Sequence, residues 1–327
     1  MMDTPESRTR KDTAKTKTHT RENKRNVSFV LLFCKGIIMS LSLTNVQQTE
    51  FDALVKIEYR SRGFLLRDSV RIRTDIIGNT CQFRRVGQVV ANPVAYQNTI
   101  AIQDPGFVAL TATLLKYAAG TAVDEIQDLT VNFDSKRELA MVVAMAIGRR
   151  SDQIIIDALG AGGSSYAQIA AGGTNFTYKK QRTFVNYFES DAVPISQRFI
   201  ALSGNNLAAI LADDHYVSRF YTSNDATVDG SLMYKDVLSM NVRVIPSMIE
   251  GGLPTTGNDQ TNTQGIRTIY AWHLMAMGMA IGQDMRTEVN YLPRETSWFV
   301  NGLFFAGAVT VDNRGVFSAL CDETVNP

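Results

Sequence analysis

Apolar and polar residues alternate over several short stretches of the chain, and this pattern predicts strands. The first such stretch is 69–76, whose period of two is typical of a half-buried strand. Gly78-Asn79 then predicts a two-residue turn, after which the strand pattern resumes over 80–90 and returns over 107–115. We therefore expect 80–115 to form a long two-stranded arm, which needs another surface to pack on because isolated hairpins are marginally stable.

Two turn signals, Asn92-Pro93 and Asp104-Pro105, mark the end of this arm. The apolar pattern is weak over 91–106, which contains both signals, and this predicts a polar tip.

Helical spacing of apolar residues appears in three other stretches. The strongest is 136–160, where Ser135 and Glu138 predict a capping box and the glycines from Gly160 onward predict the end of the helix. A shorter amphipathic helix is predicted over 46–60. Residues 269–281 are apolar nearly all round, which predicts a buried helix.

The second half of the chain mixes further strands and helices. We expect strands at 198–202 and 242–245, a helix at 207–213 capped by Asn205, an exposed loop at 251–265, and a final hairpin over 304–320 that turns at 312–315. Strands and helices are segregated along the chain rather than repeated as βαβ units, which indicates the α+β class.

The charge is unevenly placed along the 327 residues. Residues 1–38 contain 9 Lys and Arg against 4 Asp and Glu, whereas 39–327 contain 24 against 28. The first 26 residues hold almost no apolar residue and cannot bury enough surface to order themselves. Lys35-Gly36 would be encoded by purine-rich codons just ahead of Met39, as a bacterial ribosome-binding site is. Our hypothesis is that 1–38 is a disordered or non-native leader and that Met39 is the start; a basic DNA-binding arm is the alternative.

No catalytic, cofactor or metal site is predicted. His19, His215 and His273 lack a GxSxG partner motif, and we interpret His273 as a satisfied core histidine. The three cysteines form no CxxC pair, which predicts free thiols. The acidic pairs lack the spacing of a calcium loop.

Several stretches in this order resemble the coat proteins of tailed double-stranded-DNA bacteriophages with the Hong Kong 97-type fold. They are Phe64–Arg73, Tyr117–Glu125, Ala146–Leu159 and Gly315–Glu323, and the resemblance covers about 45–323. It implies an N-terminal arm (39–79), an extended-loop hairpin (80–118), a peripheral domain with a spine helix (119–175), an axial domain (176–300), and C-terminal strands that return to the peripheral domain (301–327).

The resemblance implies a major capsid protein, made in the bacterial cytoplasm, that assembles as hexamers and pentamers into an icosahedral virion shell. Its implied partners are a scaffolding protein, a portal, a decoration protein and packaged double-stranded DNA bound non-specifically; no membrane is implied. An encapsulin-like nanocompartment and an α+β enzyme with an unrecognised site are the alternatives. The isopeptide cross-link of some family members is not expected, because 80–115 contains no Lys.

A shell subunit needs contacts that differ on its two sides, together with arms that reach its neighbours. Guanidinium groups suit bidentate pairing with carboxylates of another subunit. We expect two groups of residues to contact other subunits. One is the arginines Arg71, Arg73, Arg84 and Arg85, and the other is the tip residues Asn92, Pro93, Asp104 and Pro105. The carboxylates expected to be available as partners are Asp124, Glu125, Asp128, Asp152 and Asp157.

Overall fold

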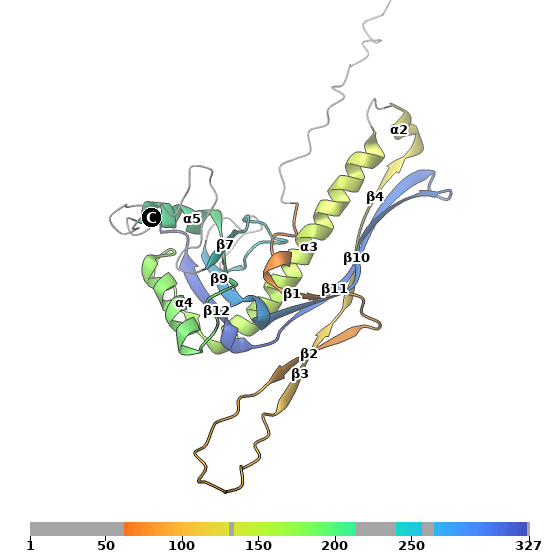
Figure 1. Cartoon of the computed structure of the whole chain (residues 1–327). Helices are drawn as coiled ribbons and strands as arrows, with labels where there is room; N and C mark the ends of the chain where they lie inside the picture. Colours follow the sequence, from red (N-terminus) through yellow and green to blue (C-terminus); the bar gives the residue numbers. More distant parts are fainter. Residues whose placement is uncertain (1–61, 131–133, 214–239, 257–264, 326–327) are drawn as a thin grey trace, which may run out of the picture. The chain divides into compact units, whose positions relative to one another are not determined.

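The structure is a computed structural model that describes residues 62–130, 134–213, 240–256 and 265–325. The helix predicted at 46–60, the leader predicted at 1–38, His215 and the middle of the loop predicted at 251–265 lie outside these ranges. The described residues combine two mixed sheets, a two-stranded arm and segregated helices, which confirms the α+β class (Figure 1).

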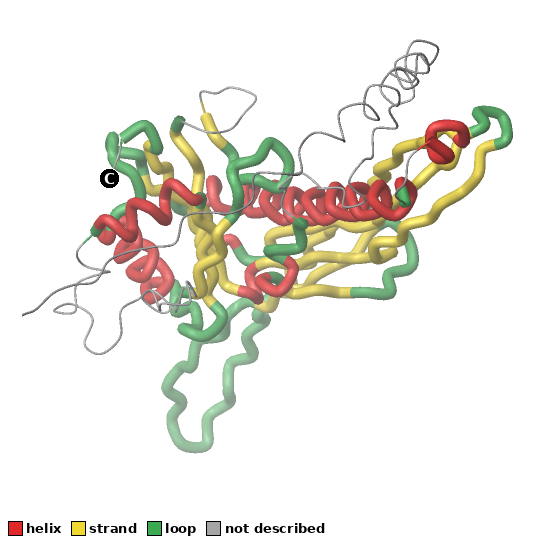
Figure 2. The backbone as a smooth tube through the Cα atoms, turned by 90° about the horizontal axis from the view of Figure 1, so that it is seen from above, coloured by secondary structure: helices red, strands yellow, loops and turns green. Residues whose placement is uncertain are grey.

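The first sheet has four strands in the order β1-β10-β11-β4. They are β1 (Arg71–Arg73), β10 (Met277–Leu292), β11 (Ser297–Thr310) and β4 (Leu115–Asp124). Strands β10 and β11 form a long antiparallel pair with β-bulges between Ile281 and Arg286. The long helix α3 (Ser135–Tyr166) lies along one face of this sheet (Figure 2). Alternate β11 residues, among them Val300 and Phe304, are buried and face it.

The second sheet has six strands. They are β5 (Gln168–Ile169), β12 (Val316–Asp322), β9 (Ile266–His273), β6 (Arg198–Leu202) and β7 (Asn241–Val244) in that order, with β8 (Thr255–Thr256) paired to β9. Helix α4 (Tyr178–Ser190) packs on β12, where the rings of Phe188 and Phe317 meet edge to face with centroids 4.8 Å apart. Helix α3 also contacts β12, so one apolar core joins both sheets.

The predicted pairing of the arm is confirmed as the antiparallel strands β2 (Thr80–Val86) and β3 (Phe107–Thr113). The strands are shorter than the 80–90 and 107–115 predicted, because the ladder ends where Val86 pairs with Phe107. The turn predicted at Gly78-Asn79 does not pair β1 with β2, because β1 pairs with β10 in the four-stranded sheet. The two short helices are α2 (Glu125–Thr130), which follows β4, and α5 (Gly204–Ala212), which follows β6. Single 3-10 turns occur at Arg67–Ser69, Leu274–Ala276 and Asn313–Gly315.

The buried helix predicted at 269–281 is wrong. This stretch is the end of β9, a 3-10 turn and the start of β10. Its residues are apolar on all sides because both strands are covered on both faces, as Trp272 and Met279 show by their complete burial.

The predicted ends of α3 are also wrong. Its N-cap is Asp134, whose carboxylate accepts the Arg137 N–H at 3.2 Å, and the Ser135 hydroxyl instead donates to Asp128. The helix continues through the glycines to Tyr166. A Cβ on Gly162 would overlap the side chain of Thr310, so this glycine serves close packing against β11 rather than termination.

Two further local predictions need correction. Ser203, not Asn205, caps α5 by accepting the Asn206 N–H at 3.1 Å. The strands over 304–320 exist, but they form no hairpin, because β11 and β12 belong to different sheets. In the loop predicted to be exposed, residues 251–253 are buried.

Candidate functional site

The base of the arm is fixed on the four-stranded sheet by an apolar cluster. Cys81 and Phe83 on β2 are buried, whereas Gln82 and Arg84 on its other face are exposed. Phe83 lies over Gly278 of β10 so closely that a Cβ there would touch the ring. The cluster is completed by side chains from β3, β10, the residue between β3 and β4, and the residue after β11: Ala112, Ala280, Leu114 and Val311.

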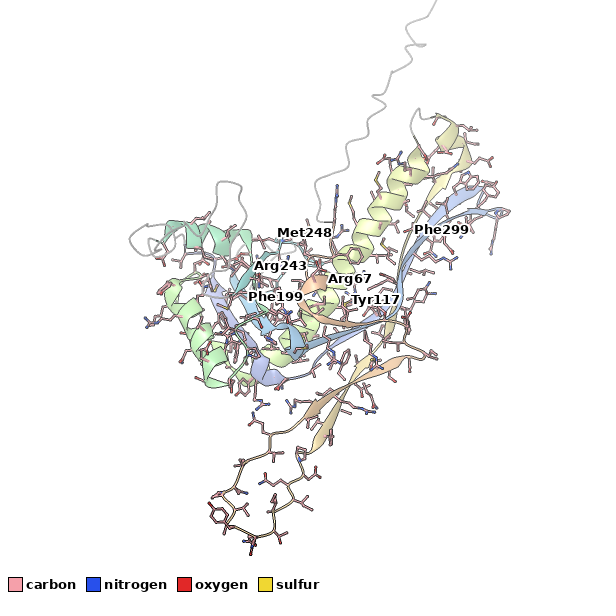
Figure 3. All side chains as sticks on the ribbon, in the orientation of Figure 1. Arg67, Tyr117, Phe199, Arg243, Met248 and Phe299 are labelled. Atoms are coloured by element: carbon pink, nitrogen blue, oxygen red, sulfur yellow. The ribbon has the colours of Figure 1, made fainter. Side chains whose placement is uncertain are left out.

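Beyond this base, the arm has no partner among the described residues for its apolar side chains. No charged residue occurs between Arg85 and Asp104. The exposed large apolar side chains of this stretch include Val90, Tyr96 and Ile102, so the stretch is uncharged but, contrary to the prediction, not polar. Figure 3 shows that the side chains at the end of the arm stand clear of the two sheets. Exposed apolar side chains gathered on one element are typical of an interaction surface.

Side-chain hydrogen bonds shape the tip. The Gln103 amide accepts the Val90 N–H at 2.9 Å and donates to the Val90 carbonyl at 2.8 Å. The Asp104 carboxylate accepts the Gly106 N–H at 3.0 Å, and the Gly87 N–H donates to the Gly106 carbonyl at the same distance.

All four predicted tip residues lie in this loop. Asn92, Pro93 and Asp104 are exposed and Pro105 is half-buried.

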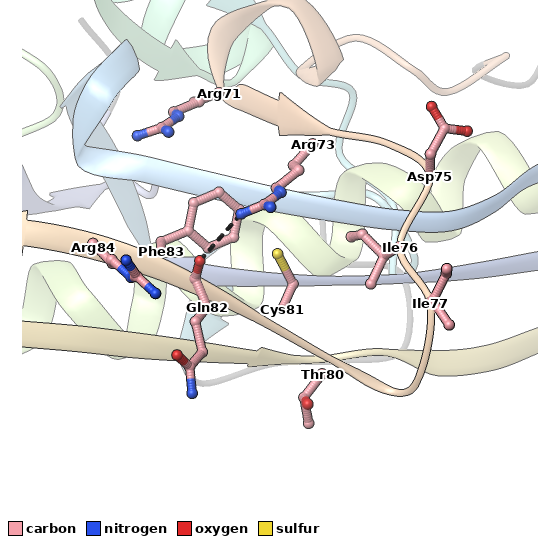
Figure 4. Close-up of a pocket in the computed structure, with 10 residues that line it drawn as sticks. All are labelled: Arg71, Arg73, Asp75, Ile76, Ile77, Thr80, Cys81, Gln82, Phe83 and Arg84. Carbon is pink, nitrogen blue, oxygen red and sulfur yellow. Dashed lines mark hydrogen bonds between the residues drawn. The ribbon is translucent and has the colours of Figure 1, made fainter.

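Three of the four predicted arginines surround one cavity at the arm base. Arg71, Arg73 and Arg84 line a cavity of about 610 Å³ between β1 and β2 (Figure 4). The Arg71 guanidinium stands 5.7 Å from the centroid of the Phe83 ring. Arg73 donates weakly to the Gln82 carbonyl at 3.5 Å across the cavity.

Arg85 has a different role from the other three. It forms an ion pair with Asp312 at 2.9 Å and so ties β2 to the turn between β11 and β12. Asp312 also binds Arg314 at 3.1 Å. Burial raises the pKa of Asp312, but the hydrogen bonds from Arg314 and the nearby Arg85 charge outweigh it and hold the pKa below its ordinary value.

The carboxylates predicted as partners differ in whether they are already paired or buried. Asp128 is already paired with Lys136 at 2.9 Å, and Asp157 accepts the Gln153 amide at 2.7 Å. Asp152 is 2% exposed, so it is not available to another subunit. Asp124 at the end of β4 and Glu125 at the start of α2 form no ion pair among the described residues, although the Glu125 carboxylate accepts the Tyr291 hydroxyl at 2.9 Å.

Sequence reasoning missed the role of Asp152. Its carboxylate accepts the backbone N–H groups of Leu65 and Leu66, both at 3.1 Å, and fastens the segment before β1 to the middle of α3. Burial raises the pKa of Asp152 to about 6, against the lowering effect of the two amides. The signal was a carboxylate inside the apolar stripe that contains Ile147 and Ile155.

The described histidine and cysteines that were considered for catalysis or metal binding are buried in the core. His273 is buried on β9, its Nδ1 accepts the Met275 N–H at 3.2 Å, and burial lowers its pKa, which fits the core histidine predicted. Cys81 and Cys321 are free and buried. Within the described ranges no group of three metal-binding side chains occurs, and no helix there is long and apolar enough to cross a membrane.

Comparisons with known proteins point in one direction. A family model described as phage capsid protein matches residues 43–323. The structure is similar to the capsid structure of cyanophage P-SCSP1u, with a TM-score of 0.66, 13% identity, and 88% of this chain and 96% of that chain covered. No match was found among curated proteins.

Two other solved structures are similar. For the capsid of Helicobacter pylori bacteriophage KHP30 the TM-score is 0.68 at 8% identity, covering 87% of this chain and 98% of that one. For a chain of Mycobacterium phage Che8 it is 0.62 at 16% identity, covering 84% and 96%.

Proposed function

This chain belongs to the phage capsid protein family, and we propose that the β2–β3 arm is the element by which each subunit holds its neighbour. The chain is a major capsid protein with the Hong Kong 97-type coat fold, a structural subunit of a tailed-phage virion. The encapsulin-like alternative is not favoured by this family.

One observation supports the role of the arm above others. Residues 86–103 carry no charge and expose several large apolar side chains, yet the base of the same hairpin is firmly packed on β10. A fixed base with an apolar, uncovered end fits an element that reaches onto another subunit. In this proposal Asn92, Pro93, Asp104 and Pro105 shape the end that makes the contact.

The proposal extends to how the subunits are arranged. We infer hexamers and pentamers as the units of the shell, with 80–118 as the extended loop, 119–175 as the peripheral domain, 176–300 as the axial domain and 301–327 returning to the peripheral domain. A scaffolding protein, a portal, a decoration protein and non-specifically held double-stranded DNA are the proposed partners, and synthesis occurs in the host cytoplasm. The net charge of −4 over 39–327 favours confinement over direct binding of the DNA.

The test replaces the end of the arm without disturbing its base. Residues 88–105 are exchanged for an Asn-Gly turn, which closes the hairpin at the Gly87–Gly106 hydrogen bond. We expect an unchanged melting temperature and loss of shells in electron micrographs, whereas the wild-type full chain assembles with its scaffold. Shells that form normally would overturn the role of the arm. A wild-type chain that stays a compact monomer under all assembly conditions would overturn the shell function itself.

A further inference from the structure

Three guanidinium groups at the arm base lack a charge partner. Arg71, Arg73 and Arg84 line the cavity between β1 and β2, and none forms an ion pair with any residue in the described ranges. Asp75 is the one carboxylate in the cavity lining, so the lining carries an excess of positive charge. We call these three arginines and their cavity the arginine cleft.

The arginine cleft also lies between two free strand edges. β1 is the outer strand of its sheet and pairs with β10, and β2 pairs with β3. Two hydrogen bonds show which residues of β2 point their backbone groups toward β3. At one end of the hairpin the Leu114 N–H donates to the Asn79 carbonyl, and at the other the Gly87 N–H donates to the Gly106 carbonyl, so the odd-numbered residues of β2 face β3. By this alternation the backbone groups of Gln82 point away from β3, into the cleft.

The observed hydrogen bond from Arg73 to the Gln82 carbonyl agrees with this direction. The cleft therefore offers backbone hydrogen-bonding groups beside its guanidinium groups, an arrangement suited to a polypeptide that carries carboxylates.

The opposite end of the four-stranded sheet has the complementary character. Asp124 ends β4 and Glu125 begins α2, and the Glu125 N–H donates to the Thr296 carbonyl at 3.1 Å, which places Glu295 at the same end. None of these three carboxylates is ion-paired with a described residue. Two cations belong to the same region: Arg294 in the adjoining turn, and Lys136, which pairs with Asp128 and lies over the Trp298 ring. We call Asp124, Glu125 and Glu295 the acidic end.

Apolar side chains accompany both surfaces. Beside the acidic end, α2 presents Ile126 at 73% and Leu129 at 81% exposure. At the rim of the arginine cleft, Ile77 is fully exposed. The two surfaces are thus complementary in apolar character as well as in charge.

The two surfaces cannot meet within one subunit. β1 pairs with β10 at Gly278–Ala280, and these residues face 307–309 of β11. Asp124 faces Ser297 at the other end of β11. About ten residues of extended strand separate the two levels, which is roughly 33 Å, far beyond the reach of any side chain.

We propose that the arginine cleft of one subunit binds the acidic end of a second copy of this chain. The contact joins different surfaces of identical subunits, so it is heterologous, and repetition of it can close a ring. This inference rests on the proposed shell function and names a partner surface separate from the uncharged arm tip.

Reciprocal charge reversal in the full chain tests the pairing. The cleft variant is Arg73→Glu with Arg84→Glu, and the end variant is Glu125→Lys with Glu295→Lys. Glu125 gives up only an exposed hydrogen bond, which its carboxylate accepts from the Tyr291 hydroxyl at 2.9 Å. Asp124 is spared because its carboxylate accepts the Ile126 N–H at the start of α2. The swap variant combines all four changes. A matched control, Lys179→Glu with Arg182→Glu, makes the same charge change at exposed positions of α4.

We expect the cleft variant and the end variant to keep the wild-type melting temperature and to lose at least about tenfold in shell yield, since like charges then face each other. The swap variant should recover most of the yield, and the control should assemble normally. Single variants that assemble as well as the control, or a folded swap variant that does not recover, would overturn this pairing. If the wild-type chain forms shells in the same experiment, such a result would contradict the pairing alone and not the shell function.

Discussion

Asp152 in the middle of α3 accepts the backbone N–H of Leu66 at 3.1 Å, although 86 residues separate the two in the chain. Close to this bond, the backbone of the same segment crosses α3 at Gly148, and the Phe64 N–H donates to the Gly148 carbonyl at 3.3 Å. Trp272 of β9 completes the attachment, because its indole N–H donates to the Ser69 carbonyl at 2.8 Å. The segment that leads into β1 is thus held by a helix and by the second sheet together.

The buried Asp152 carboxylate should make subunit stability depend on pH. Its pKa is raised by burial to about 6 in the folded chain, above the ordinary value of 3.8, so the folded state binds the proton more tightly than the unfolded state. Stability from this group is therefore present below about pH 3.8 and is lost as the pH rises through about 6.

The measurement compares wild type with Asp152→Asn, which keeps an acceptor oxygen and does not titrate. Denaturant unfolding of the unassembled subunit at several pH values should show the wild type losing stability relative to the variant, by up to about 3 kcal/mol between pH 4 and pH 7.5. A stability difference that does not vary with pH would show that Asp152 is not the titrating group.

Gly148→Ala should weaken the attachment of the segment before β1. A Cβ at this position would overlap the Arg62 carbonyl and press on the Phe64 ring, so one backbone has to move. We expect a loss of about 1–3 kcal/mol in the free energy of unfolding and faster hydrogen exchange over 62–70. Gly204→Ala is the matched control, since its Cβ would meet nothing within 4 Å, and its stability should be unchanged or slightly higher.

Lys180→Met should destabilise the fold around the end of β12. Four carbonyl oxygens, those of Ala171, Thr174, Asn175 and Leu320, lie 2.7–3.1 Å from the Lys180 Nζ and share its three N–H donors. Methionine fills a similar volume but leaves these acceptors without their donor, so we expect a loss of about 2–4 kcal/mol. Lys179→Met, at an exposed neighbouring position, should change the unfolding free energy by less than about 0.5 kcal/mol; similar losses in both variants would contradict a special role for Lys180.

Arg85→Ala should weaken the attachment of the arm to the body, whereas Arg84→Ala should weaken assembly. Because Arg85 pairs with the partly exposed Asp312, its loss should change global stability by less than about 1 kcal/mol. It should nevertheless speed hydrogen exchange in β2 and β3. Arg84→Ala should leave that exchange unchanged and lower the shell yield, and the reverse pattern would contradict the two roles.

Local patterns were sufficient to predict several elements of this protein. The alternation in β2 predicts the face that carries Cys81 and Phe83, which packs on the four-stranded sheet, and the 3–4 residue spacing in α3 predicts its buried stripe. The α+β class and the resemblance to phage coat proteins followed from the order of such segments. For the candidate site, Arg71, Arg73 and Arg84 were predicted as contact residues; they line one cavity, and their contact with another subunit stays a prediction. The half-buried strand predicted at 69–76 is wrong in its extent and burial, because β1 spans only Arg71–Arg73 and all three residues are exposed.

Only the tertiary structure decided which strands pair and which charges are already satisfied. An apolar stretch such as 269–281 is compatible with a buried helix or with strands covered on both faces, and the neighbours decide between them. A glycine such as Gly162 can end a helix or allow a side chain such as that of Thr310 to pack closely against the helix, and the sequence does not distinguish the two. Arg85 differs from Arg84, and Asp152 from Asp124, because of partners far away in the chain. Composition and period are local properties, whereas burial and charge pairing depend on residues that only the folded chain brings together.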